Sequence, residues 1–302
     1  MLLIQTLNGL QFGLLLFLLA AGLTLVFGVM NFVNLAHGSL YMMGAYFGAA
    51  VANATGSFAL ALVVAIPAAL LLGILVERIA LAGLHRRDHL DQVLATFGLV
   101  LCFNELVRMI WGPSPVYAQV PEALSGTVPL FGIEYPAYRF AIIVIGLLVA
   151  AGLWWLIHRT RLGMLIRAGA THAAIVSALG VNIRLLNTLI FGLGAALAGL
   201  AGLMAGPLLA VQPGMGEPIL ILTLVVIVVG GIGSIRGALL AALLLGLVEA
   251  LGAGYLPLGL GQLAAAQVAQ TVAPALGSML IYLLMAAVLA LRPQGLFPAA
   301  GR

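Results

Sequence analysis

A group of polar side chains interrupts apolar sequence early in the chain. Asn31, Asn34 and His37 are spaced three residues apart, and Gly28 and Gly38 bracket them. Such groups are costly in hydrocarbon unless they are paired or face a cavity. A glycine-flanked, asparagine-rich interruption fits a broken helix, whose free backbone groups can bind a solute. Hydrogen bonding between helices, or a position for His37 at a turn, would explain the same residues without a binding role.

A second polar group follows the apolar run at 92–104. Glu105 and Arg108 are three residues apart and can pair on a helix, and Asn104 precedes them. Arg108 lies just before Trp111, where a long side chain can reach the membrane interface. The pair can therefore be structural, or the group can line a solute path.

Two more carboxylates lie beside or within apolar runs. Glu249 stands between LLLGLV and ALGAGY without a local basic partner. An unpaired carboxylate inside a membrane is protonated or matched to a distant arginine. Glu217 lies beside Pro218 near a predicted helix start, where it could hold a solute or cap the helix. Both residues are candidates for the solute path.

Other chemistry is excluded by missing residues. His85 and His89 are four apart but lack the acid of H-E-x-x-H, Cys102 is alone, and no G-x-S-x-G string occurs. All twelve basic residues are arginine, so neither a P-loop lysine nor a Schiff-base lysine exists. The glycines of GGIGSIRG (230–237) have the wrong spacing for a dinucleotide fingerprint and predict a tight turn. We expect no catalytic residue, no metal and no cofactor.

The composition indicates that membrane-spanning helices position these polar residues. The chain has 302 residues, of which 64% are hydrophobic and 7% charged, against about 25% charged in soluble domains. Residues 1–76 carry no Asp, Glu, Lys or Arg, which leaves room for three spans of about 20 residues. The N-terminal run lacks a basic region and reads as an uncleaved first span. Long apolar runs without strand alternation predict an all-α polytopic membrane protein with about eight or nine transmembrane helices in a single domain over 1–302.

Arginine bias predicts the orientation of this bundle, because basic residues in short loops stay in the cytoplasm. If the helices alternate in direction, most of the arginines fall on one side: Arg78, Arg86, Arg87, Arg159, Arg161, Arg167, Arg184, Arg236, Arg292 and Arg302. Only Arg108 and Arg139 fall opposite. The N-terminus is then outside and the C-terminus cytoplasmic. The arginines are scattered between apolar runs, so we expect contact with membrane lipid and no nucleic-acid partner.

Two connecting segments are long enough to carry structure. Segment 112–138 is rich in proline and predicts an ordered external loop that could face a delivery partner. Segment 158–187 is too polar to span and predicts a short amphipathic helix ending at Gly180. That helix could be gripped by another protein or could lie on anionic lipid. In the span that follows, Ala198, Gly202 and Gly206 share one face and predict close helix packing.

Four strings give the chain a resemblance to a known family. They are GLTLVFGVMNFVNLAHGSLYMMGAY (22–46), RAGATHAAIVSALGVN (167–182), VVGGIGSIRGALLAALLLGLVEAL (228–251) and LRPQGLF (291–297). In this order, over most of the chain, they resemble the LivH-type permease subunit of branched-chain amino acid ABC importers.

The resemblance implies a division of labour among subunits. A second, LivM-like permease would pair with this chain, an extracytoplasmic binding protein would deliver substrate, and two cytoplasmic ATPase subunits would drive transport. The family's coupling region falls on Arg167, Ala168, Ala174, Leu179, Gly180 and Asn182. Where relatives commonly carry acidic residues in this loop, the present chain has Thr171 and His172, so no salt bridge to the ATPase is expected there.

The resemblance also implies a location and a cargo class. The chain would be a multi-pass protein of the bacterial inner (plasma) membrane that translocates branched-chain or related amino acids. Related permeases also move urea or short amides, which stays open as an alternative. A less favoured reading is an ion-coupled secondary transporter that uses Glu105 or Glu249 as its carrier.

Overall fold

The computed structural model describes residues 1–85, 87–130, 132–263 and 266–297. Over these residues the helices are α1 (Leu2–Met30), α2 (His37–Thr55), α3 (Phe58–Val76), α4 (His89–Trp111), α5 (Ala137–Arg159), α6 (Arg161–Ala178), α7 (Ile183–Ala205), α8 (Gly216–Gly230), α9 (Ile235–Leu263) and α10 (Ala266–Leu291). A π-helical turn, Glu77–Leu81, extends α3, and two short strands, β1 (Thr127–Leu130) and β2 (Ile133–Pro136), form an antiparallel hairpin.

Helix lengths and composition confirm an all-α polytopic membrane protein. Among the described residues, six helices are long and apolar enough to cross a bilayer: α1, α3 with its π turn, α4, α5, α7 and most of α9. Shorter apolar helices lie at Gly216–Gly230 and Ala275–Leu291. The charge-free run 1–76, in which three spans were expected, contains three helices, and two of them, α1 and α3, are among these six. Segment 112–138 contains the hairpin and a short 3-10 turn, Glu122–Leu124.

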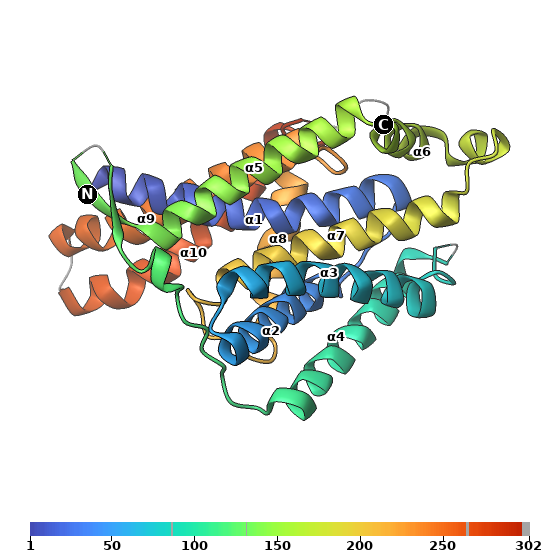
Figure 1. Cartoon of the computed structure of the whole chain (residues 1–302). Coiled ribbons are helices and arrows are strands. Elements are labelled where there is room, and N and C mark those ends of the chain that lie inside the picture. The colour runs from blue at the N-terminus through green and yellow to red at the C-terminus, as the bar shows by residue number, and fades with distance from the viewer. Residues whose placement is uncertain (86, 131, 264–265, 298–302) are drawn as a thin grey trace.

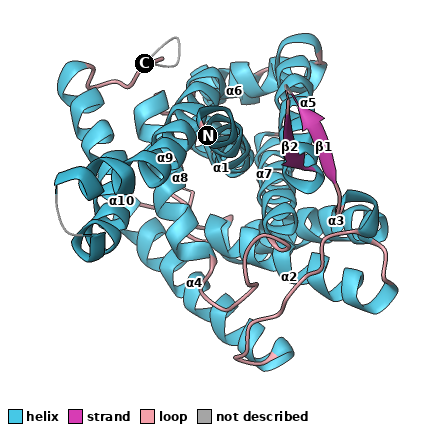
Figure 2. Cartoon of the chain, turned by 90° about the vertical axis from the view of Figure 1, so that its left-hand side faces the viewer, coloured by secondary structure: helices cyan, strands magenta, loops and turns pink. Residues whose placement is uncertain are grey.

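Helix α1 forms the centre of the bundle (Figures 1 and 2). Its residues from Gly13 to Val26 are buried, because α5, α7, α8 and α9 surround it. The bundle has two distinct ends. We call the end that holds the β1–β2 hairpin the hairpin end, and the opposite end, where α6 lies, the α6 end (Figure 1).

Small residues allow the central helices to approach closely. A Cβ atom on Gly44 of α2 would collide with the backbone of Gly199 on α7, and one on Gly202 would collide with the carbonyl of Tyr41. Ala198 is fully buried on the same part of α7. The predicted packing of small residues is therefore confirmed for Ala198 and Gly202, whereas Gly206 follows the end of α7 and makes no such close contact.

The chain breaks between α1 and α2, as one reading of its polar residues predicted. Asn31 ends α1 in the left-handed conformation with φ of 48°, and residues 32–36 are not helical. His37 then begins α2 with Nε2 3.1 Å from the carbonyl oxygen of Leu19. Leu19 lies about 16 Å along α1 from Met30, so the segment 31–36 runs back beside α1. His37 is thus buried within the bundle and does not lie at its end.

Helix α6 crosses the α6 end and then leaves it. Thr160 caps its start by accepting a hydrogen bond from the Gly163 amide. The helix bends at His172, whose φ of −145° and ψ of 72° are not helical. Beyond the bend the chain projects past the other helices (Figure 1). The connection itself is shorter than the predicted 158–187, because α5 continues to Arg159 and α7 begins at Ile183.

Candidate functional site

A small cavity lies where the starts of α2 and α8 meet the side of α4. It has a volume of about 10 Å³, which is room for about one water molecule. Gly38 and Gly216 cross so closely that a Cβ atom on either would collide with the carbonyl of the other. We call it the α8 cavity. Its lining is Leu35, Gly38, Ser39, Met42, Val100, Asn104, Gly216, Glu217 and Leu220.

Two candidates that are distant in sequence meet at this cavity. Asn104 Nδ2 donates a hydrogen bond to Glu217 Oε1 at 2.7 Å. The Oδ1 atom of the same amide accepts from the Gly214 backbone nitrogen at 3.2 Å. Glu217 lies in the first turn of α8, where a carboxylate is favourable to the helix dipole, and its contact with Asn104 also ties α8 to α4.

Asn34 and His37, near the start of α2, are buried with polar atoms that have no hydrogen-bond partner among the described residues. Asn34 is 1% exposed, and neither its Oδ1 nor its Nδ2 hydrogen-bonds to a described residue. Ser39 is 3% exposed and lines the α8 cavity. His37 has one ring nitrogen near Leu19 and leaves Nδ1 unpaired among described atoms.

The remaining charged candidates lie elsewhere. Glu105 and Arg108 form the predicted i,i+3 pair, with 2.9 Å between Oε1 and Nη1, and both side chains are more than half exposed. Glu249 lies on α9, one turn beyond Gly246, which packs on Gly9 of α1. Its Oε2 atom has no hydrogen-bond partner among described residues. The structure therefore joins Asn104 to Glu217 but not to Glu249.

A larger pocket opens at the α6 end, beside the first turn of α4. Its volume is about 260 Å³, and its lining is Met30, Asn31, His85, Arg87, Asp88, His89 and Gln92. The buried Gln92 amide organises this pocket. Its Nε2 donates to the carbonyls of Leu84 and Arg87, at 3.3 and 3.0 Å, and its Oε1 accepts from the Val33 nitrogen at 3.3 Å. Gln92 thereby ties the broken segment 31–36 to the loop before α4.

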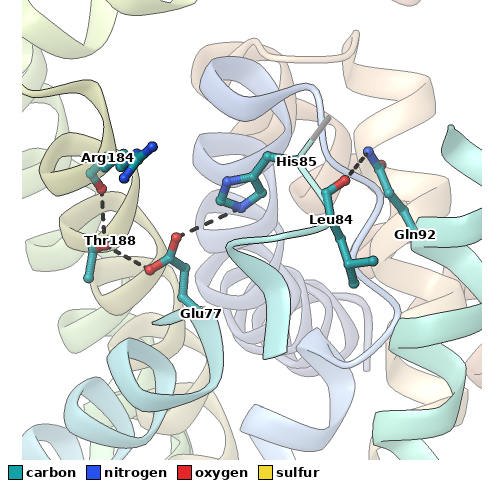
Figure 3. Close-up of polar contacts among 6 residues, drawn as sticks. All are labelled: Glu77, Leu84, His85, Gln92, Arg184 and Thr188. Atoms are coloured by element: carbon teal, nitrogen blue, oxygen red, sulfur yellow. Dashed lines mark hydrogen bonds and ion pairs between the residues drawn. The ribbon is translucent and has the colours of Figure 1, made fainter. Parts of the chain in front are cut away.

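A buried carboxylate lies next to this pocket (Figure 3). Glu77, 3% exposed in the π-helical turn, accepts a hydrogen bond from the Thr188 hydroxyl of α7 at 2.7 Å. His85 Nε2 lies 3.8 Å from the other carboxylate oxygen. Burial lowers the pKa of His85 below its usual 6.5, although the nearby Glu77 opposes that shift. His85 is therefore neutral at neutral pH, and the contact is polar but not an ion pair.

The predicted coupling residues divide into anchored and exposed positions. Arg167 donates from its guanidinium to the Ile157 carbonyl at the end of α5, and Ala168 is half-buried beside it. Asn182 caps α7 by accepting from the Leu185 amide at 3.1 Å. Ala174 is exposed, Leu179 is 79% exposed, and Gly180 has φ of 89° with open space around it. The base of α6 is thus fixed to the bundle, while its far end is free.

Sequence reasoning missed several of these residues. Glu77 carries the first charge after 76 uncharged residues, which is a signal for a functional position. Gln92, Thr188 and Ser39 gave no such signal, because isolated polar residues in apolar runs are common.

The fold is that of a multi-pass membrane protein, and its class follows from comparison with known families. The chain matches the family model described as the permease component of the branched-chain amino acid transport system over residues 5–289. It therefore belongs to the branched-chain amino acid permease family of ABC transporters, and it is a transport subunit and not an enzyme.

Individual relatives agree with this family. The chain is 33% identical over 264 residues to the high-affinity branched-chain amino acid transport system permease protein BraD of Pseudomonas aeruginosa, covering 82% of this chain and 85% of that protein. It is 30% identical to the LivH permease of Escherichia coli K12, covering 83% and 86%. The ribose import permease protein RbsC of the same organism is 28% identical over 77% of this chain and 72% of its own length. No solved structure matches the chain.

Proposed function

We propose that this chain is the membrane-spanning subunit of an ATP-driven importer for branched-chain or related amino acids. It pairs with a second, LivM-like permease and receives its cargo from an extracytoplasmic binding protein. Two cytoplasmic ATPase subunits supply the energy. The similarity to BraD and LivH over more than four-fifths of the chain supports this cargo class.

The main structural support for coupling to the ATPase is the shape of α6. Its base is held by Arg167, while Ile175 and Leu179 expose apolar surface, 57% and 79%, on the part that projects from the bundle. An exposed apolar projection between two spans fits a groove on another protein. We infer that the ATPase grips this part of α6 and that its closure moves α5 and α7.

Charge distribution supports an orientation with the α6 end in the cytoplasm and the N-terminus outside. The helix ends gathered there carry Arg78, Arg87, Arg159, Arg161, Arg167, Arg184, Arg236 and Arg292. Arg108 and Arg139 lie toward the hairpin end, where Arg139 binds Asn8. Arg86 and Arg302 lie outside the described residues. Basic residues favour the cytoplasmic side, which in a bacterium makes this an inner-membrane protein with segment 112–138 outside.

The two cavities suggest a route for the cargo. Both lie against α4 and the segment 30–39, the α8 cavity at Val100 and Asn104 and the larger pocket at Gln92. Gln92 and Asn104 are about 18 Å apart along α4. We propose that cargo passes along this side of α4, from the α8 cavity to the cytoplasmic pocket.

Transport by the complete assembly in proteoliposomes tests the proposal. Radiolabelled L-leucine uptake should require the binding protein and ATP, and should stop with a hydrolysis-dead ATPase. Uptake that persists without ATP, or that an ion gradient drives through this chain alone, would overturn it in favour of a secondary transporter. Urea, acetamide and ribose, assayed in parallel, separate the other cargo classes that the family and the RbsC similarity suggest.

A further inference from the structure

The α8 cavity combines features that suit one kind of solute. Two helix N-termini converge there, and the Gly38 and Gly216 amides make no hydrogen bond to a described residue. Helix N-termini attract anionic groups through free N–H donors and the helix dipole. Ser39, 3% exposed, lines the same cavity and adds a hydroxyl donor. The amides of Gly38 and Gly216 and the Ser39 hydroxyl are therefore suited to bind a carboxylate.

A carboxylate of the protein lies at the same cavity. Glu217 is fixed by Asn104, which engages Oε1 and leaves Oε2 without a described partner. The Glu217 side chain is exposed at the start of α8, so this second oxygen is open to a cationic group of a solute. The nearest arginine on α4, Arg108, already pairs with Glu105.

The rest of the lining is apolar. Leu35, Met42, Val100 and Leu220 contribute hydrocarbon from three segments of the chain. A solute with a positive and a negative group a few atoms apart could place the positive group at Glu217 and the negative group at the helix N-termini. The side chain of that solute would then contact the apolar lining.

We propose that the α8 cavity is a binding site for the zwitterionic backbone of an α-amino acid. The ammonium group binds Glu217, the carboxylate binds the amides at Gly38 and Gly216 and the Ser39 hydroxyl, and an aliphatic side chain lies against Val100 and Leu220. This assignment rests on the proposed function, because it requires that amino acids cross this subunit.

The cavity must enlarge to accept such a solute, since its present volume is about 10 Å³. Helix α4 is the element that can move. It is buried along one narrow stripe, which includes Thr96, Val100 and Phe103. Neighbouring positions such as Leu101, 52% exposed, face away from the bundle. Displacement of α4 from α8 would open the site while breaking few contacts.

Protection of engineered cysteines tests the site in the complete transporter. Cys102, the single cysteine, is first replaced by serine. Val100→Cys on α4 and Leu220→Cys on α8 then report on the cavity from two helices, and Leu101→Cys is the matched control on the outer face of α4. Each variant is labelled with a methanethiosulfonate reagent during turnover, with and without L-leucine, and leucine uptake is measured on the same preparation.

Saturating leucine, at about ten times its apparent Kd, should slow labelling of Val100→Cys or Leu220→Cys about tenfold, because only the unoccupied fraction reacts. Leu101→Cys should be unaffected, and Glu217→Gln should abolish the protection. Uptake without protection at either position, or protection that survives Glu217→Gln, overturns the site and leaves the proposed function standing. Absence of ATP-driven leucine uptake in the Cys102→Ser parent overturns the proposed function itself.

Discussion

Thr188 of α7 donates a hydrogen bond of 2.7 Å to the buried carboxylate of Glu77 at the end of α3. Thr188 lies in the second turn of α7, six residues after the Asn182 cap that follows α6. Glu77 in turn faces His85, in the loop that Gln92 organises. Polar contacts therefore lead from Thr188, near the start of α7, to the loop beside the larger pocket (Figure 3). If α6 transmits movement as proposed, α7 and these contacts connect it to the segment 31–36.

Removal of the Thr188 hydroxyl should weaken this connection. Thr188→Val leaves Glu77 buried with one fewer donor, which costs about 1–3 kcal/mol. We expect a lower thermal midpoint of the purified complex, and Thr188→Ser, which keeps the donor, should retain most of the stability. Equal midpoints for Thr188→Val and the parent would show that the hydrogen bond contributes nothing.

The half-buried imidazole of His85 should have a pKa below its usual value. Burial lowers its pKa below 6.5 and the Glu77 carboxylate raises it, so Glu77→Gln should lower the pKa further. The unfolded chain then binds more protons below pH 6.5, and this group's contribution to stability is lost as the pH falls from 6.5. NMR of labelled histidine, assigned by loss of the signal in His85→Gln, measures the midpoint. A midpoint above 6.5 would contradict the buried position.

Close packing of α7 on α2 should tolerate no added methyl group. In Gly202→Ala the new Cβ would collide with the Tyr41 backbone, and overpacking of this kind costs about 1–3 kcal/mol. Gly98→Ala on α4 is the matched control, because a Cβ there meets nothing within 4 Å and alanine favours helix. Denaturation of both variants in detergent should separate them. A Gly202→Ala protein as stable as Gly98→Ala would argue against the observed α2–α7 contact.

A bulky residue at the exposed end of α6 should uncouple the transporter. Gly180→Trp is expected to assemble in the membrane but to hydrolyse ATP with little leucine uptake, because it alters the surface proposed to meet the ATPase. Gly56→Trp provides the control, since Gly56 also has a positive φ and open surroundings but lies at the end of α2, away from α6. The ratio of leucine imported to ATP hydrolysed is the readout. A normal ratio in Gly180→Trp would count against the coupling role.

Local sequence patterns predicted several helices, one ion pair and the break between α1 and α2. The charge-free first 76 residues gave three helices, the spacing of Glu105 and Arg108 gave their ion pair, and the glycine-flanked asparagines gave the break after Met30. These features depend on residues close in sequence, where hydrophobic length and helical periodicity act directly.

Contacts between distant segments could not be predicted in this way. Asn104 and Glu217 are 113 residues apart, and Glu77 and Thr188 are 111 apart. Their meeting depends on how glycines such as Gly38 and Gly216 let helices cross, and a single sequence does not specify those crossings. The sequence therefore predicted Asn104 and Glu217 as separate candidates. Only the packing of the helices shows that they contact each other at one cavity.

Crosslinking from the exposed end of α6 tests the central claim most directly. A photoreactive amino acid at position 179, where Leu179 is 79% exposed, is activated while the complete transporter hydrolyses ATP and imports leucine. The proposed mechanism predicts a protein adduct with the cytoplasmic ATPase subunit. Adducts with lipid alone, in a preparation that transports normally, would contradict it.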